Sequence, residues 1–284
     1  MAETAPALRI CPLCEATCGL TVTVEDERIT AVRGDREDVF SRGFICPKGA
    51  SFGELDEDPD RLTRPLVRGA DGELRETGWD EAFAAVAAGL GGVLGRGDPQ
   101  AVALFLGNPN VHTMAGSLYP PVLMSVLRTR NVFTASTLDQ MPKHVSSGLL
   151  YGDAFAIPVP DVDRTDHLLV IGANPLDSNG SLATAPDFPG KLKRLRRRGG
   201  RLTVVDPRRT RTAKLADRHL AVRPGSDALL LMAMVQVLFA EGLVETGELG
   251  AHLSGVEEVG RLAEGFTPEA VADACDVPAA EIRA

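Results

Sequence analysis

The chain has 284 residues, of which 44% are hydrophobic and 24% are charged, a composition that fits a globular protein with about two domains. Its formal net charge of −9 argues against general binding to nucleic acid, and we expect no membrane span because no apolar run is long enough. Residues 1–9 contain neither an apolar signal core nor a twin-arginine pair, so we expect a cytoplasmic protein.

Four cysteines dominate the N-terminal part of the chain. Cys11, Cys14 and Cys18 form a C-x2-C-x3-C arrangement, and Cys46 follows in a later loop. Three thiolates this close in sequence can converge on one metal centre, and a distant loop must then supply the fourth ligand. A three-plus-one grouping favours a 4Fe–4S cluster. A four-cysteine zinc site is the alternative, although such sites are usually built from two separated C-x2-C pairs.

Residues 1–62 are predicted to form a small β-rich domain around these cysteines. Residues 20–24 alternate between apolar and polar side chains, and residues 28–33 return after an acidic turn, which is typical of a β-hairpin. The acidic, proline-containing stretch at 54–65 then indicates a linker.

Residues 63–284 alternate between helical and strand patterns. Helices are predicted at 79–94, 113–128 and 228–241, and strands at 101–106, 131–134, 167–171, 201–205 and 219–222. Short, continuous apolar strands that alternate with helices predict a parallel sheet covered on both faces. We therefore expect a doubly wound α/β region, in which ligands bind beyond the carboxyl ends of the strands.

Four loops at those strand ends, residues 106–110, 171–175, 204–210 and 223–227, carry groups suited to a ligand. Glycine lets a ligand approach the backbone, and asparagine offers both a donor and an acceptor. An aspartate can bind ribose hydroxyls or the donor edge of a purine, and arginine binds phosphate through paired donors. Serine and aspartate in the last loop are first of all helix caps, and the same helix start can bind an anion.

The sequence Phe44-Ile45-Cys46-Pro47-Lys48-Gly49 places a lysine two residues after the fourth cysteine. With the cysteine spacing, it resembles the N-terminal cluster domain of the molybdenum/tungsten bis-pterin oxidoreductases, the superfamily of formate dehydrogenases, nitrate reductases and DMSO reductases. The resemblance implies a 4Fe–4S cluster on the four cysteines and a role for Lys48 in electron transfer between cluster and pterin. A lysine by itself is usually a solvated surface charge.

The four loops match, in order, the loops with which this family binds a guanine dinucleotide pterin. The resemblance thus implies a molybdenum or tungsten bis-molybdopterin guanine dinucleotide cofactor. The residues that it assigns to this cofactor are Gly107, Asn108, Gly172, Asn174, Asp206, Arg208, Thr210, Gly225 and Asp227.

The family also implies a protein ligand to the metal in the loop after residues 131–134. Family members use a cysteine, selenocysteine, serine or aspartate, whereas residues 135–144 contain no cysteine and Asp139 is their only carboxylate. Asp139 is either that ligand or the N-cap of a helix that begins near Met141. His144 is either a proton donor on the substrate side or a packed or surface histidine. The missing cysteine argues against formate dehydrogenase and periplasmic nitrate reductase chemistry.

Two further features have ordinary explanations. The segment from Lys191 to Lys214 contains 11 basic residues in 24 and no aromatic residue. We interpret it as a solvated helix face beside a phosphate-bearing cofactor rather than as a surface for nucleic acid or an acidic partner. Cys275 has no partner in the sequence and is expected to be a small buried residue.

The function that these features predict is a molybdopterin-dependent oxidoreductase. Redox or oxygen-atom transfer would occur at the metal, and electrons would pass through the 4Fe–4S cluster to an electron-transfer protein or redox subunit. Catalytic subunits of the family are longer, so we expect an incomplete, inactive chain whose partner is the missing C-terminal portion. A non-catalytic cluster- or cofactor-binding subunit for electron transfer and a four-cysteine zinc-binding interaction module are the alternatives.

Overall fold

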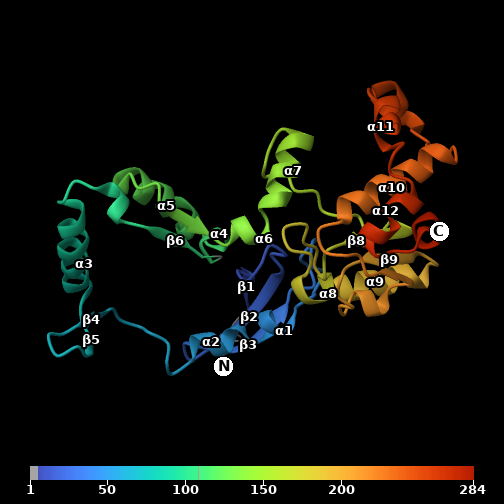
Figure 1. Cartoon of the computed structure of the whole chain (residues 1–284). Coiled ribbons are helices and arrows are strands. Elements are labelled where there is room, and N and C mark those ends of the chain that lie inside the picture. Colours follow the sequence, from blue (N-terminus) through green and yellow to red (C-terminus); the bar gives the residue numbers. More distant parts are fainter. Residues whose placement is uncertain (1–5, 108) are drawn as a thin grey trace. The chain divides into compact units, whose positions relative to one another are not determined.

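The computed structural model describes residues 6–107 and 109–284 (Figure 1). The chain divides into two compact units, the first made of residues 1–159 and 181–187 and the second of residues 160–180 and 188–284. Within the described residues, no helix combines the length and the apolar character that crossing a membrane requires.

The first unit begins with the antiparallel strands β1 (Ala7–Ile10), β2 (Gly19–Glu25) and β3 (Arg28–Gly34), which pair in that order. The turn between β2 and β3 is tight because Asp26 and Glu27 both take left-handed conformations, with φ of 49° and 63°. The predicted hairpin is confirmed. Two short helices, α1 (Pro47–Ala50) and α2 (Phe52–Asp56), pack against β3 (Figure 1), so the predicted linker at 54–65 begins as the end of a helix.

The rest of the first unit alternates between strands and helices. Its elements are β4 (Leu66–Arg68), β5 (Leu74–Glu76), α3 (Trp79–Leu94), η1 (Pro99–Ala101), β6 (Leu104–Leu106), α4 (Pro109–His112), α5 (Met114–Leu127), β7 (Val132–Thr134), α6 (Ser136–Asp139) and α7 (Met141–Tyr151). β6 and β7 pair in parallel. β6 is shorter than predicted because the Asp98 carboxylate accepts the Gln100 amide hydrogen at 2.9 Å and caps a 3-10 turn instead.

The helices α3 and α5 expose much of their apolar surface. No residue of α3 is buried, and Trp79 and Phe83 are 65% and 64% exposed. On α5, Tyr119 is 72% exposed. Apolar surface of this extent is uncommon on isolated domains and typically marks a face that another polypeptide covers.

The second unit is built on three parallel strands, β8 (His167–Ile171), β9 (Arg201–Val205) and β10 (Arg218–Leu220), in the order β10-β9-β8. The helical elements are α8 (Pro175–Ser178), α9 (Phe188–Arg197), η2 (Ala213–Leu215), α10 (Asp227–Ala240), η3 (Gly247–His252), α11 (Val256–Ala263), α12 (Pro268–Cys275) and α13 (Ala279–Arg283). The predicted α/β class with parallel strands is therefore confirmed. Among the described residues the parallel strands form two sheets, β6–β7 and β8–β9–β10, while β4 and β5 form an antiparallel pair.

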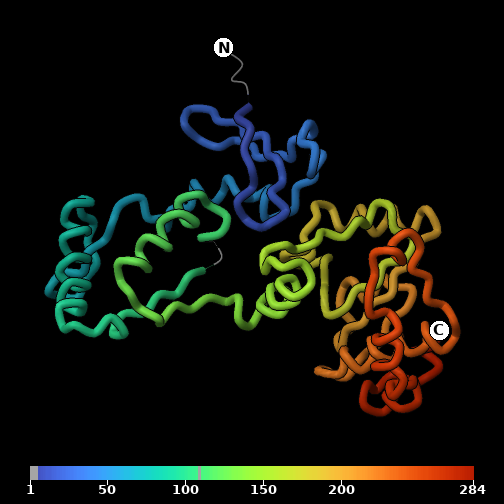
Figure 2. The backbone as a smooth tube through the Cα atoms, turned by 90° about the horizontal axis from the view of Figure 1, so that it is seen from above, coloured from blue at the N-terminus to red at the C-terminus, as the bar shows by residue number. Residues whose placement is uncertain are grey.

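One hydrophobic core of the second unit joins β9 and β10 to the C-terminal helices, the orange and red part of the chain in Figure 2. Leu230 and Ala233 of α10 are buried against Val271 and Cys275 of α12 and against Ile282 of α13. Cys275 has no exposed surface, which confirms its prediction as a small buried residue.

The residues that flank the C-terminal helices α12 and α13 define where each helix begins. Thr267 caps α12, because its hydroxyl oxygen accepts the Ala270 amide hydrogen at 3.2 Å. The start of α13 has no such side-chain cap. Asp276 ends α12 in a left-handed conformation with φ of 57°, and α13 begins only after Pro278.

The helix α9 presents a charged outer face and an apolar inner face. Leu192 and Leu195 are almost fully buried, whereas Lys191 and Arg194 both form ion pairs with Asp163. These contacts support the interpretation of the basic segment as a solvated helix face.

The ion pairs of Asp163 predict a small pH dependence of stability. The hydrogen bond from Lys191, together with the charges of Lys191 and Arg194, lowers the pKa of the Asp163 carboxyl. A carboxyl with a lower pKa in the folded state stabilises the fold above its ordinary pKa, and this contribution disappears as the pH falls through the folded value. The side chain is 48% exposed, so we expect less than about 1 kcal/mol.

Replacing Asp163 with Asn should therefore lower stability at neutral pH and leave it nearly unchanged at strongly acidic pH. Unfolding midpoints measured for both proteins between neutral and acidic pH test this. A destabilisation that stays constant across that range would contradict the role of the charge.

Candidate functional site

The fold of the first unit brings the four N-terminal cysteines together. Cys11 follows β1, Cys18 precedes β2, and the Cys11 amide donates to the Cys18 carbonyl at 2.9 Å, which closes the loop that carries Cys14. Cys46 occupies the N-cap position of α1. Thr17, within this loop, has a φ of 43°, an unusual conformation for a β-branched residue that is found mainly at functional sites.

Cys11, Cys14 and Cys18 pack in the same cluster of apolar side chains. Cys11 and Cys18 are each 7% exposed and form a cluster with Ala16 and Leu20. Burial, together with the neighbouring Cys11, Cys14 and Cys46, raises the pKa of Cys18 to about 11. Burial also raises the pKa of Cys11. The thiols of Cys11 and Cys18 are thus protonated at neutral pH, and a bound metal centre would have to displace these protons.

The spacing of the thiols bears on which metal centre fits. Within the described part of the chain, no three His, Cys, Asp or Glu side chains lie close enough together to hold a single metal ion. A tetrahedral zinc ion needs sulfurs about 4 Å apart, whereas an iron–sulfur cluster places irons and sulfides between the thiolates. Four converging cysteines, three of which pack among apolar side chains, fit a cluster better than one ion.

The helix α1 lies directly against this cluster of cysteines. A Cβ added to the buried Gly49 would come within 3.8 Å of the Cys11 sulfur and 3.1 Å of the Ile45 side chain. Glycine therefore allows α1 to approach the thiols. Lys48, one residue earlier on α1, is exposed, so its side chain is free to reach a neighbouring group.

In the second unit, the carboxyl ends of three adjacent parallel strands place the loops after β8, β9 and β10 at one edge of the sheet. The Gly172 amide donates to the Val205 carbonyl at 2.9 Å, and the Asp206 amide donates to the Leu220 carbonyl at 3.1 Å. The structure thus brings together the three loops that contain Gly172, Asp206 and Gly225.

The side chain of Asn174 joins two of these loops. Its Oδ1 accepts hydrogen bonds from the Thr212 amide at 3.2 Å and from the Thr212 hydroxyl at 2.8 Å, while its Nδ2 donates to Asp177. The Thr212 oxygen also accepts the Leu176 amide hydrogen at 3.3 Å, and Thr212 has no exposed surface. The amide of Asn174 therefore holds the two loops together.

Asp206 is only 8% exposed, and its Oδ1 accepts the Arg208 amide hydrogen at 2.8 Å. Thr210 is buried, and its hydroxyl oxygen accepts the amide hydrogen of Ala213, the first residue of η2, at 3.1 Å. Arg208 is exposed. This loop therefore presents a carboxylate that is held by the backbone, two residues before an exposed cation.

The two glycines at this edge leave space for a ligand. Gly172 and Gly225 have φ of 59° and 87°, and a Cβ on either would meet no atom within 4 Å. Ser226 occupies the N-cap position of α10, but its hydroxyl donates back to the Arg223 carbonyl at 2.7 Å. Asp227 lies partly exposed in the first turn of α10. Open backbone, a carboxylate and an arginine are groups that fit a dinucleotide-type cofactor.

The fourth loop lies in the first unit, after β6. The Gly107 carbonyl accepts hydrogen bonds from the amide and the side chain of Asn110, both at 3.2 Å. Asn108 lies outside the described residues. His112, which the sequence analysis missed, has a buried Nε2 without a hydrogen-bond partner among the described residues. Its position one helical turn after this loop was the only sequence signal.

Asp139 and His144 flank the junction of α6 and α7. Asp139 is the exposed last residue of α6, and the N-cap of α7 is Gln140, so the prediction of Asp139 as that N-cap is wrong. The short helix α6, which follows β7 directly, takes Asp139 out of the capping position. The His144 Nδ1 lies 2.8 Å from the Ala154 carbonyl, and its ring packs edge-on against Phe155. His144 is therefore a packed histidine whose Nε2 remains for another partner.

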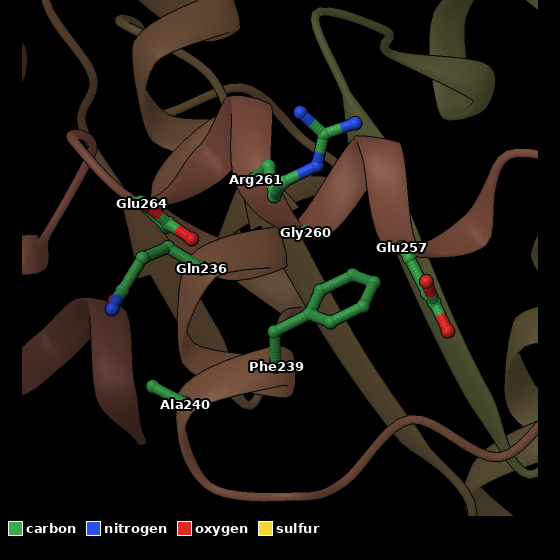
Figure 3. Close-up of a pocket in the computed structure, with 7 residues that line it drawn as sticks. All are labelled: Gln236, Phe239, Ala240, Glu257, Gly260, Arg261 and Glu264. Carbon is green, nitrogen blue, oxygen red and sulfur yellow. The ribbon is translucent and has the colours of Figure 1, made fainter.

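A separate hollow of about 380 Å³ lies between α10 and α11 (Figure 3). Phe239 forms its apolar wall, and Glu257 and Glu264 lie at its edge. A Cβ on Gly260 would come within 2.8 Å of the Phe239 ring, so glycine allows the two helices to approach. None of the residues predicted for a cofactor lines this hollow.

The first unit holds four cysteines that lie close together, and the second holds a sheet edge whose groups fit a dinucleotide-type cofactor. These two features define the class of redox proteins that bind both kinds of cofactor. The family model of the molybdopterin oxidoreductases matches residues 61–268, and that of the molybdopterin oxidoreductase Fe4S4 domain matches residues 9–55. The chain belongs to the molybdopterin oxidoreductase family, whose cofactors are a 4Fe–4S cluster and a molybdopterin that holds molybdenum or tungsten.

Proteins of similar sequence or structure support this assignment. Formate dehydrogenase H of Escherichia coli is 29% identical over 96% of this chain and 38% of its own length. Nitrate reductase of Symbiobacterium thermophilum is 27% identical over 97% of this chain and 37% of its own length. The structure of acetylene hydratase from Pelobacter acetylenicus shares the fold, with a TM-score of 0.76 and 23% identity over 97% of this chain. The chain thus spans little more than a third of these proteins.

Proposed function

We propose that this chain forms the N-terminal part of a molybdopterin-dependent oxidoreductase, in which Cys11, Cys14, Cys18 and Cys46 hold the 4Fe–4S cluster. The convergence of these thiols in an apolar shell, within the segment that matches an Fe4S4 domain, carries the proposal. When bound, the molybdenum or tungsten centre supplies redox or oxygen-atom transfer chemistry, and the cluster carries electrons to a redox partner.

The residues of the chain would hold and connect these cofactors. The apolar side chains around Cys11 and Cys18 exclude water from the cluster, which influences its reduction potential. Lys48 lies on the helix that contacts Cys11, which supports a role for its ammonium group in stabilising negative charge near the cluster.

The second unit would bind one guanine dinucleotide pterin. The carboxylate of Asp206 can accept hydrogen bonds from the guanine edge or from ribose hydroxyls, and the exposed Arg208 can pair with phosphate. The open Gly172 and Gly225 allow the cofactor to approach the backbone. Asp139, exposed after β7, remains the proposed protein ligand to the metal, and His144 is proposed to line the substrate side through its Nε2.

The boundary at residue 62 between a cluster domain and an α/β region is also a proposal, supported by family matches that end at residue 55 and begin at residue 61. The exposed apolar residues of α3 and α5 support packing against the further part of a catalytic subunit. The free cysteines of the described residues suit a reducing compartment, and we place the protein in the cytoplasm.

A second candidate function is electron transfer without catalysis. The packing of the cysteines against β2, β3 and α1 favours this function. These elements all belong to the first unit, so a cluster there would need no ligand from the sheet of the second unit. Such a subunit would bind iron but no molybdenum or tungsten.

Elemental analysis of the chain purified without oxygen tests both candidates. About four irons per chain with matching sulfide are expected for one cluster. Molybdenum or tungsten in addition would support a cofactor-binding catalytic portion, whereas iron alone would support the electron-transfer subunit. One zinc ion without iron would contradict both.

A further inference from the structure

The two segments that carry the cysteines are joined by a buried hydroxyl group. Ser41 is 4% exposed, and its Oγ accepts the Gly19 amide hydrogen at 3.1 Å, a contact between residues 22 positions apart. Gly19 directly follows Cys18, and Ser41 belongs to the loop that leads to Cys46. The hydrogen bond therefore links the segment of the first three cysteines to the segment of the fourth.

Ser41 is itself held in place from two sides. Asp38 Oδ2 accepts hydrogen bonds from the Ser41 amide and the Ser41 hydroxyl, both at 2.6 Å. These two bonds lower the pKa of the Asp38 carboxyl, so it is ionised at neutral pH and is a strong acceptor. The Ser41 carbonyl in turn accepts the Phe44 amide hydrogen at 2.9 Å, two residues before Cys46.

The two segments also approach each other at the level of the backbone. The Asp35 amide donates to the Gly19 carbonyl at 2.9 Å. A Cβ on Gly19 would lie 2.6 Å from the Asp38 Cβ, and one on Gly34 would lie 2.2 Å from the Gly43 carbonyl oxygen. Only glycine permits such contacts, so the position of the Cys46 loop against Cys18 is fixed by this junction.

We propose that Ser41 is a positioning residue for the iron–sulfur cluster, because its hydroxyl anchors the loop of Cys46 to the backbone beside Cys18. This inference rests on the proposed cluster site. A cluster with four protein ligands requires the fourth thiolate at a fixed distance from the other three. Because the Ser41 hydroxyl oxygen accepts the Gly19 amide hydrogen, this hydrogen is not available to the sulfur of Cys18. Hydrogen bonds to cluster sulfurs help to set the reduction potential, so Ser41 influences that potential as well.

The test compares the full chain with its Ser41→Ala variant, both purified and reconstituted without oxygen. Removing the hydroxyl leaves the Gly19 amide without its partner, and a lost hydrogen bond at a buried donor corresponds to roughly tenfold faster release of iron to a chelator. The reduction potential of the cluster should rise in the variant, because the freed amide can donate to sulfur and stabilise the reduced cluster. Ser41→Thr, which keeps the hydroxyl, should restore both properties.

Thr30→Val is the matched control. Thr30 lies exposed on β3 of the same sheet, and its hydroxyl donates only to the Thr23 carbonyl at 3.5 Å. Loss of this hydroxyl should leave the iron release rate and the reduction potential unchanged. A variant that is only less stable would show a lower unfolding temperature with an unchanged potential, and that result would overturn the proposal for Ser41.

The possible failures are distinguishable. Absence of iron and sulfide from the reconstituted wild-type chain would refute the proposed cluster site itself. A wild-type cluster combined with the same release rate and potential in Ser41→Ala would refute the role of Ser41 alone. If Ser41→Ala does not fold, Asp38→Asn weakens the acceptor that holds Ser41 and should shift the potential in the same direction. An unchanged potential in that variant would also refute the proposal.

Discussion

Replacing Cys46 with alanine should reduce the iron content of the anaerobically reconstituted chain from about four atoms per molecule to three or fewer. The iron that Cys46 would hold then has no protein ligand, since Lys48, the ionisable side chain nearest to it in the sequence, is exposed on α1. The remaining cluster should also lose iron faster and show an altered absorption and electron paramagnetic resonance spectrum. Metal analysis and both spectra on the same preparation measure this.

Cys275→Ala provides the matched control, because Cys275 is the one cysteine outside the N-terminal group. It is fully buried among α10, α12 and α13, so its replacement should lower stability slightly and leave the iron content unchanged. Four irons and an unchanged spectrum in Cys46→Ala would show that Cys46 is not a ligand. Loss of iron in Cys275→Ala would show that the measurement reports unfolding.

Replacing Leu230 with alanine should destabilise the second unit by about 3 kcal/mol. Leu230 is 1% exposed and lies in the core formed by β9, β10, α10 and α12, where a truncated side chain leaves a cavity that the surrounding side chains cannot fill without strain. Amide hydrogen exchange in α10 and α12 measures the effect, since it reports on this unit separately from the first.

The neighbouring Leu231→Ala is the control for this effect. Leu231 is 38% exposed on the same helix, so the same truncation removes less buried surface and should cost under about 1 kcal/mol. Equal protection losses in both variants would indicate a change in helix propensity rather than a cavity. No loss in Leu230→Ala would contradict the core described for α10.

The loops at the sheet edge show how far residue types alone can assign a site. Asn174 was predicted to contact the cofactor, but its amide is used by Thr212 and Asp177. A cofactor that approaches Asn174 would therefore meet its backbone rather than a free amide. Asp206 differs, because only Oδ1 has a partner within the loop and the second carboxylate oxygen remains available. The proposed pterin contacts of this edge thus rest mainly on Asp206, Arg208 and the two open glycines.

The sequence predicted features that depend on neighbouring residues. The strands at 167–171 and 201–205 and the helix at 79–94 appear with the predicted bounds, because continuous apolar runs and helical periodicity are local properties. The predicted strand at 219–222 is observed as Arg218–Leu220, and the strand at 101–106 is shortened by the Asp98 cap. Such shifts reflect turn chemistry that competes with strand propensity at element ends.

By itself, the sequence determined the chemistry of this protein: four thiols in a three-plus-one spacing, a lysine beside the last of them, and polar loops after apolar strands. Only the tertiary structure decided which polar groups serve the architecture. Ser41 binds the backbone beside Cys18, and Thr212 binds Asn174, through contacts between residues 22 and 38 positions apart. Spacing along the chain fixes what a short segment can form, but a hydrogen bond between distant segments depends on how they pack. For that reason neither hydroxyl was identifiable before the fold was known.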